Sequence, residues 1–183
     1  MAAKNVFGLL AGVDLYPQNA RLNGCVADSF DMEQYLRDTV PANSLHLLTL
    51  RNEQATKSNM KDGFLKHLTQ AKENDVVIIH YAGHGSREAA DPVFWHLAPD
   101  RMNEVMVPVD AITSDMRMNN PLADKELKWL IREVAKNNPH IAVVLDCCHS
   151  GDGTRLAGTF KNRFTSARQD TVRTFEEYVF KDD

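Results

Sequence analysis

Short apolar runs alternate with helix-length amphipathic segments along most of this chain, and this order constrains its fold more than any other feature. The runs that predict strands are residues 6–14, 44–50, 75–83 and 141–148. The segments with apolar residues at helical spacing are residues 24–40, 55–72 and 121–138. Such a β-α-β-α-β-α-β order predicts a mostly parallel sheet with right-handed crossovers and helices on both faces.

The third predicted strand, residues 75–83, is a nearly continuous apolar run, and the fourth begins with five apolar residues, 141–145. The first of these patterns is typical of a strand covered on both faces, and the second predicts a buried strand. Residues 94–110 predict a hairpin outside the main layers. The residues beyond Gly151 show no strand pattern and predict a long loop with a short terminal helix.

The length of 183 residues and the ordinary composition predict one globular domain. A net charge of −4 gives no electrostatic footprint for nucleic acid or for an anionic membrane. No apolar run reaches the roughly 20 residues of a membrane helix, and Asp14 interrupts the first run too early for a signal peptide. The three cysteines do not suit a disulfide framework, so a cytoplasmic protein is expected.

Reactive side chains follow the last two predicted strands. The stretch "HYAGHGS" (80–86) closes the third strand, and "DCCHSG" (146–151) closes the fourth. Ligands of α/β sheets bind at the carboxyl ends of the strands, so His84 is expected to lie near Cys147 and Cys148. A thiol with a pKa of about 8.5 is mostly protonated at neutral pH and needs a nearby histidine to act as a nucleophile. The two stretches together predict a Cys–His catalytic site.

Two other interpretations use the same stretches. A serine hydrolase acting through Ser150 is disfavoured because the G-x-S-x-G pattern is absent. A zinc site is disfavoured because adjacent cysteines converge poorly on one ion. Its candidate ligands are His80, His84, Cys147, Cys148 and His149. Outside these stretches, Cys25 is expected to be a small core residue.

These stretches resemble the two catalytic blocks of the metacaspases and their bacterial relatives, in the caspase-like cysteine protease clan. Two further stretches, "RLNGCVADS" (21–29) and "MVPVDA" (106–111), resemble the blocks after the first strand and before the third helix. The blocks occur in the family's order between about Val6 and Gly158. The resemblance implies a caspase-like three-layer α/β sandwich. The animal caspase signature Q-A-C-x-G is absent, so cleavage after aspartate is not implied.

The resemblance also implies roles for individual residues. His84 would be the general base, and Cys148, the second of the adjacent cysteines, would be the nucleophile. The backbone N–H groups of Gly85 and Cys148 would form the oxyanion hole. Asp28 and Asp146 match the acids of the family's first specificity pocket, where paired carboxylates favour a guanidinium or ammonium group. The expected function is that of a cysteine endopeptidase cleaving proteins after Arg or Lys.

Many metacaspases are activated by calcium through clustered aspartates, and this chain matches the cluster only in part. Asp110 and Asp124 match, but Lys125 stands where a second acid is expected and Arg155 lies where another is expected. A calcium ion takes about six or more oxygen ligands. We therefore expect no required cofactor and leave calcium activation as the alternative.

Only 35 residues follow Cys148, whereas family members continue with a small subunit that completes the substrate cleft. We therefore expect residues 1–158 to form a catalytic large-subunit domain and residues 159–183 a basic intersubunit loop or tail. The basic side chains between Arg155 and Arg173 suit either self-cleavage or a solvated loop. Activation by processing or by partner binding is expected, the partner being a small subunit or the downstream portion of the same precursor. The alternative is a catalytically silent caspase-like interaction module.

Overall fold

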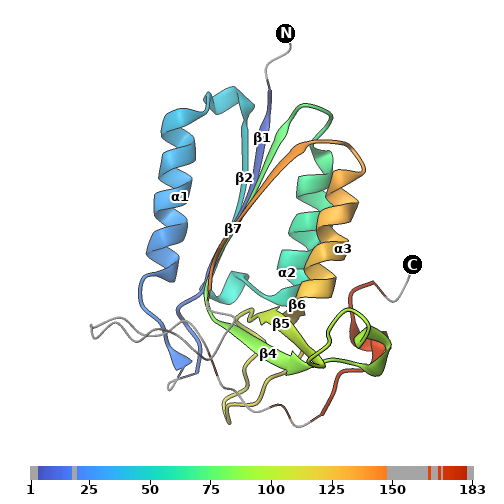
Figure 1. Cartoon of the computed structure of the whole chain (residues 1–183). Helices are drawn as coiled ribbons and strands as arrows, with labels where there is room; N and C mark the ends of the chain where they lie inside the picture. The colour runs from blue at the N-terminus through green and yellow to red at the C-terminus, as the bar shows by residue number, and fades with distance from the viewer. Residues whose placement is uncertain (1–3, 18–19, 148–164, 166–168, 170, 181–183) are drawn as a thin grey trace.

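The computed structural model describes residues 4–17, 20–147, 165, 169 and 171–180, and its centre is a four-stranded sheet (Figure 1). All four strands run parallel, in the order β2-β1-β3-β7. They are β1 (Val6–Gly12), β2 (Leu45–Arg51), β3 (Val76–Ala82) and β7 (His140–Asp146). The predicted strands and their parallel arrangement are confirmed.

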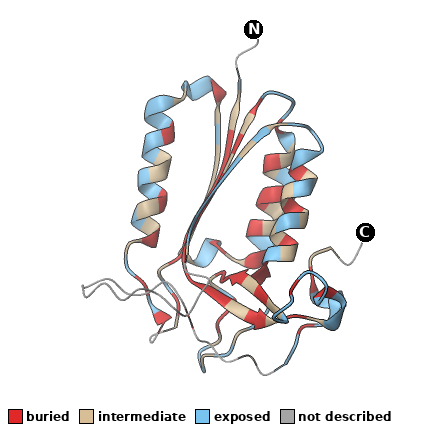
Figure 2. Ribbon diagram, viewed as in Figure 1, coloured by how far each residue is buried: buried red, intermediate tan, exposed pale blue. Residues whose placement is uncertain are grey.

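Helices cover both faces of this sheet. One face is covered by α1 (Cys25–Thr39), and the other by α2 (Lys57–Asp62) and α3 (Asp124–Ala135) (Figure 1). The buried residues of these helices face the sheet and the exposed ones face outward (Figure 2). Leu130 and Val134 of α3 are fully buried, as their spacing predicts. Within the described residues, no helix is both long and apolar enough to cross a membrane. The expected three-layer α/β fold is confirmed.

The second predicted helix is irregular in its later half. A π-helical turn, η4 (Gly63–His67), and a 3-10 turn, η5 (Leu68–Gln70), follow α2. Gly63 packs directly on β1, since a Cβ atom there would come within 2.8 Å of the Leu9 side chain. Glycine therefore lets this helix approach the sheet more closely than any other residue would.

The apolar residues of α1 do not all enter the core. Cys25 is fully buried, which confirms its expected structural place. Phe30 and Tyr35 are 53% and 62% exposed. The Arg51 guanidinium covers the Phe30 ring, with its carbon 3.5 Å from the ring centroid, so this ring packs against a cation rather than the core.

A smaller antiparallel sheet lies at the carboxyl ends of the parallel strands (Figure 1). Its order is β4-β5-β6, with β4 (Gly85–Ala89), β5 (Met102–Met106) and β6 (Leu122–Ala123). The expected excursion in residues 94–110 thus supplies β5, whereas β4 was not predicted. The other short elements are η2 (Ala42–Ser44), η3 (Asn52–Gln54), η6 (Pro92–Phe94) and η7 (Phe175–Glu177). The last of these is the expected short terminal helix, reduced to one 3-10 turn.

The burial of β7 differs from the prediction. Val143, Val144 and Leu145 are 40%, 41% and 37% exposed. Among the described residues, β7 pairs only with β3 and so forms one edge of the sheet. The prediction of a buried strand is wrong for β7, because the described segments cover these side chains only in part.

Candidate active site

The turn after β3 and the end of β7 lie side by side at the carboxyl edge of the parallel sheet. Gly83 donates its N–H to the carbonyl oxygen of Asp146 across a distance of 3.4 Å. His84 is one residue beyond this contact on one strand, and Cys147 is one residue beyond it on the other. The strand order therefore brings the histidine turn next to the beginning of the cysteine stretch. Three residues considered for the site lie outside the described residues: Cys148, His149 and Ser150.

The His84 side chain is held in a fixed, buried position. It is 3% exposed, and its Nε2 lies 2.6 Å from the carbonyl oxygen of Ala20. Because a carbonyl oxygen only accepts hydrogen bonds, Nε2 carries the proton in this contact. In the neutral ring Nδ1 is then the basic nitrogen. The Tyr16 ring packs against the imidazole with 4.6 Å between the ring centroids.

Two buried tyrosines fix the backbone of His84. The His84 N–H donates to the Tyr16 hydroxyl at 3.0 Å, and the Tyr81 hydroxyl donates to the His84 carbonyl oxygen at 2.9 Å. The Tyr16 hydroxyl in turn donates to the Val107 carbonyl oxygen at 2.7 Å. Burial raises the pKa of both phenols above the ordinary value, so both remain protonated at neutral pH. No motif in the sequence identifies these tyrosines; their only signal is a place near the carboxyl end of a strand that leads to the site.

The variant Tyr16→Phe tests whether the Tyr16 hydroxyl stabilises the backbone of His84. Loss of the hydroxyl leaves the His84 N–H buried without its acceptor, which is expected to lower the free energy of unfolding by about 1–3 kcal/mol. Urea denaturation measures this change. Tyr35→Phe is the matched control, because Tyr35 is 62% exposed and its variant is expected to unfold like the wild type. Equal stability of the two variants would contradict this role for the Tyr16 hydroxyl.

Asp14, just after β1, organises the loop that supplies the Ala20 carbonyl group. Its carboxylate accepts the N–H groups of Cys25 and Val26, at 3.0 and 3.2 Å, at the start of α1. Its carbonyl oxygen accepts the N–H of Leu22 at 3.1 Å. A carboxylate at a helix N-terminus is stabilised by the unpaired N–H groups and by the helix dipole. Asp14 therefore ties the end of β1, the loop and α1 together around His84.

The other predicted site residues lie at the same edge of the sheet. Gly85 is the first residue of β4 and is buried, and its carbonyl oxygen accepts the N–H of Thr165 at 3.1 Å. Asp28 lies in the first turn of α1 and is partly buried. Asp146 is the last residue of β7 and is exposed. Asp146 thus adjoins the histidine turn through the Gly83 contact, whereas Asp28 lies at the start of the helix that follows the Ala20 loop.

Cys147 is partly buried and packs against the hydrophobic core. This packing is that of a small apolar side chain. No cluster of three or more histidine, cysteine or acidic side chains suitable for a metal occurs among the described residues. Of the candidate zinc ligands, His80 is a buried residue within β3, and Cys148 and His149 are outside those residues.

The acids considered for calcium already have partners of another kind. The Lys125 ammonium lies 2.9 Å from the Asp124 carboxylate, and its side chain is only 10% exposed. The Asp110 carboxylate accepts the backbone N–H of Lys57 at 3.0 Å. A cationic side chain thus stands where a calcium site needs a further oxygen ligand. Within the described part of the chain, these acids do not gather into a group that could hold a metal ion.

A parallel α/β sandwich with a histidine turn and a cysteine stretch at adjacent strand ends defines a caspase-like domain. The family model described as "Metacaspase, peptidase C14 domain" matches residues 8–157. The chain therefore belongs to the metacaspase family.

Individual relatives agree with this assignment. Metacaspase-1A of Aspergillus oryzae is 29% identical over 154 residues, which cover 81% of this chain and 35% of that protein. Metacaspase-1 of Emericella nidulans is 26% identical, with 81% and 36% covered. The chain thus spans about a third of the length of these relatives. A solved structure from Geobacter sulfurreducens has the same fold, with a TM-score of 0.61, 24% identity, and coverage of 80% of this chain and 52% of that one.

Proposed function

We propose that this chain is the large-subunit portion of a cysteine endopeptidase that cleaves proteins after Arg or Lys. The observation that carries the proposal is the pairing of β3 with β7, which puts the His84 turn beside the strand that leads to Cys148. Membership of the metacaspase family supports the same reaction class.

In the proposed reaction Cys148 attacks the carbonyl carbon of the scissile peptide bond. His84 Nδ1 takes the thiol proton and then delivers it to the leaving amine. The bond between His84 Nε2–H and the Ala20 carbonyl oxygen favours this tautomer and stabilises the imidazolium formed during proton transfer. The N–H groups of Gly85 and Cys148 would stabilise the oxyanion. Water then hydrolyses the thioester, with His84 acting as the base once more.

The preference for basic residues rests on Asp28 and Asp146. In the proposed pocket these two carboxylates pair with the guanidinium of arginine or the ammonium of lysine. If the substrate residue before the cleaved bond were aspartate, its carboxylate would be repelled by these two acids. We propose no metal in the reaction, since Lys125 is paired with Asp124 in the region considered for calcium.

The exposed edge of β7 supports the need for a further portion of the protein. Val143, Val144 and Leu145 expose apolar surface on a strand whose outer edge no described strand pairs with. If added strands cover such side chains, each Å² of apolar surface removed from water contributes about 25 cal/mol to the free energy of their binding. We propose that a small subunit or the downstream portion of the precursor binds here. The same exposed edge also fits a caspase-like interaction module that never cleaves, which is the second candidate function.

Short fluorogenic peptides ending in Arg, Lys or Asp test this proposal, with the downstream portion of the protein present. We expect kcat/KM after Arg or Lys to exceed that after Asp by at least about 100-fold, because each mispaired charge costs several kcal/mol. Asp28→Asn and Asp146→Asn should each raise KM for the Arg peptide. Asp31→Asn, an exposed acid of α1, is the matched control.

Two outcomes would contradict the proposal. Preferred cleavage after Asp would contradict the acidic pocket. No cleavage of any peptide, with calcium or with a chelator, would favour the interaction module. Equal rates with calcium and with a chelator are expected if no metal takes part.

A further inference from the structure

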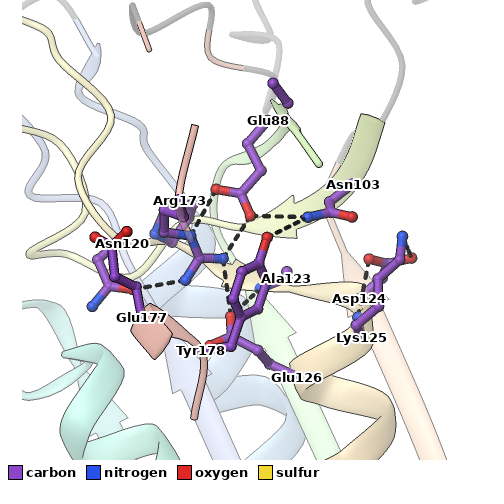
Figure 3. A network of polar contacts seen from close by, with 12 residues as sticks. Glu88, Asn103, Asn120, Ala123, Asp124, Lys125, Glu126, Arg173, Glu177 and Tyr178 are labelled. Carbon is purple, nitrogen blue, oxygen red and sulfur yellow. Dashed lines mark hydrogen bonds and ion pairs between the residues drawn. The ribbon is translucent and has the colours of Figure 1, made fainter. Parts of the chain in front are cut away.

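Arg173, in the segment near the C-terminus, is inserted between two buried carboxylates that belong to distant elements (Figure 3). Its Nε lies 3.0 Å from Glu88 Oε2 on β4, and its Nη2 lies 3.2 Å from Glu126 Oε2 on α3. Nη1 donates to the Asn120 side chain at 2.7 Å. Arg173 is 5% exposed and both glutamates are fully buried. The guanidinium therefore joins the small sheet to a helix of the main sandwich.

The charges in this cluster balance only when Arg173 is present. Lys57 Nζ lies 2.8 Å from Glu126 Oε1, and the Lys57 residue as a whole is only 6% exposed. The two buried carboxylates thus meet two buried cations, Lys57 and Arg173. Removing the segment that carries Arg173 would leave a buried negative charge without its partner, which is strongly unfavourable.

Aromatic and backbone contacts extend the same attachment. The Tyr178 ring is 1% exposed and lies 4.2 Å from the Arg173 guanidinium carbon. Its hydroxyl accepts a hydrogen bond from Asn103 at 2.9 Å, and its ring packs on Phe94 with 4.9 Å between centroids. The Val179 N–H donates to Glu126 at 3.0 Å. An arginine and a tyrosine five residues later are therefore the two anchors of this segment.

Earlier described residues of the segment lie along the edge of β4 that is opposite β5. The Thr165 carbonyl oxygen accepts the Ser86 hydroxyl at 2.6 Å, and the Gln169 side chain accepts the Ala89 N–H at 2.7 Å. Thr165 also donates its N–H to the carbonyl oxygen of Gly85, the residue after His84. The contacts thus run from the histidine turn to the Arg173 cluster.

We propose that this segment, which is anchored through Thr165, Gln169 and residues 171–180, is a built-in peptide ligand of the large subunit and stays bound after the chain is cut between Cys148 and Thr165. The partner that the surface fits is a peptide with an arginine followed five residues later by an aromatic side chain. A processed protein would then retain this peptide beside the histidine turn. Arg173 itself is too buried to be a cleavage site in this state. The inference concerns binding and does not depend on the proposed peptidase activity.

The test inserts a recognition sequence for a site-specific protease between Gly158 and Thr159, in a Cys148→Ala background that prevents self-cleavage. After cutting, size-exclusion chromatography and native mass spectrometry follow the fragment of residues 159–183. We expect the fragment to elute with the large portion. Its release from the otherwise unaltered cut protein would overturn the proposal.

A competition experiment isolates the role of Arg173 without requiring a variant protein to fold. A labelled synthetic peptide of residues 159–183 is exchanged into the cut complex, and its Arg173→Met form is compared with its Val172→Ala form. Val172 is 46% exposed and is the matched neighbour. We expect the Arg173→Met peptide to bind at least about 100-fold more weakly. Equal binding of both peptides would show that Arg173 is not the anchor and would overturn the proposal.

Discussion

Cys148→Ala is expected to abolish peptide hydrolysis, whereas Cys147→Ala is expected to keep most of it. Loss of the nucleophile in a protease lowers kcat by roughly 10,000-fold or more, because no other side chain forms the covalent intermediate. Cys147 packs against the core, so its truncation costs mainly packing. The measurement is kcat/KM on an Arg-ending peptide, with the downstream portion of the protein present.

Thiol labelling separates this result from a loss of folding. A basic peptide with a thiol-reactive group should label the wild type and Cys147→Ala, but not Cys148→Ala. Thermal unfolding of all three proteins provides the control for stability. If Cys148→Ala kept its hydrolysis and Cys147→Ala lost it, the nucleophile would be Cys147 and not Cys148.

The sequence was sufficient to predict the main sandwich. Each parallel strand and each covering helix has its own apolar pattern, and such patterns depend mainly on local burial. The order of the strands brings together the carboxyl ends of β3 and β7, which lead into the two polar stretches. Strand β4 was missed because Ser86, Arg87 and Glu88 give it no apolar alternation. Glu88 is buried and paired with Arg173, which lies 85 residues away in the sequence.

The burial of β7 shows a different limit of sequence patterns. A continuous apolar run indicates that a strand is meant to be covered, but it does not identify the covering segment. Val144 looks like a core residue in the sequence and is 41% exposed in this chain. Its pattern therefore predicts a covering segment that the described residues do not supply.

The support of His84 could be predicted only in part. The glycine-flanked histidine was visible in the sequence, and so was its place at a strand end. Its ring partner is the Ala20 carbonyl group, a backbone atom that every residue type possesses. A backbone partner cannot be recognised from the residue types in the sequence. It becomes visible only in the folded structure, where Asp14 holds the loop that carries Ala20.

Arg173→Met is expected to lower the free energy of unfolding by about 3–5 kcal/mol, the usual cost of removing one partner of a buried ion pair. Glu88 and Glu126 would then share Lys57 as their one remaining buried cation in the described cluster. Burial alone would lower the pKa of Arg173, but the Glu88 hydrogen bond and the Glu126 charge raise it above the ordinary value. The arginine is therefore charged throughout the working pH range. Urea denaturation with intact protein measures the change.

A second substitution distinguishes lost charge balance from lost packing. If the unpaired carboxylate causes the destabilisation, Glu88→Gln should be less harmful in the Arg173→Met background than in the wild type. We expect a coupling of about 1–3 kcal/mol in this double-mutant cycle. Glu104→Gln, at a partly exposed acid of β5, is the matched control and should not couple to Arg173. Strict additivity of Arg173→Met and Glu88→Gln would mean that the arginine stabilises the fold through its packing on Tyr178 rather than through its charge.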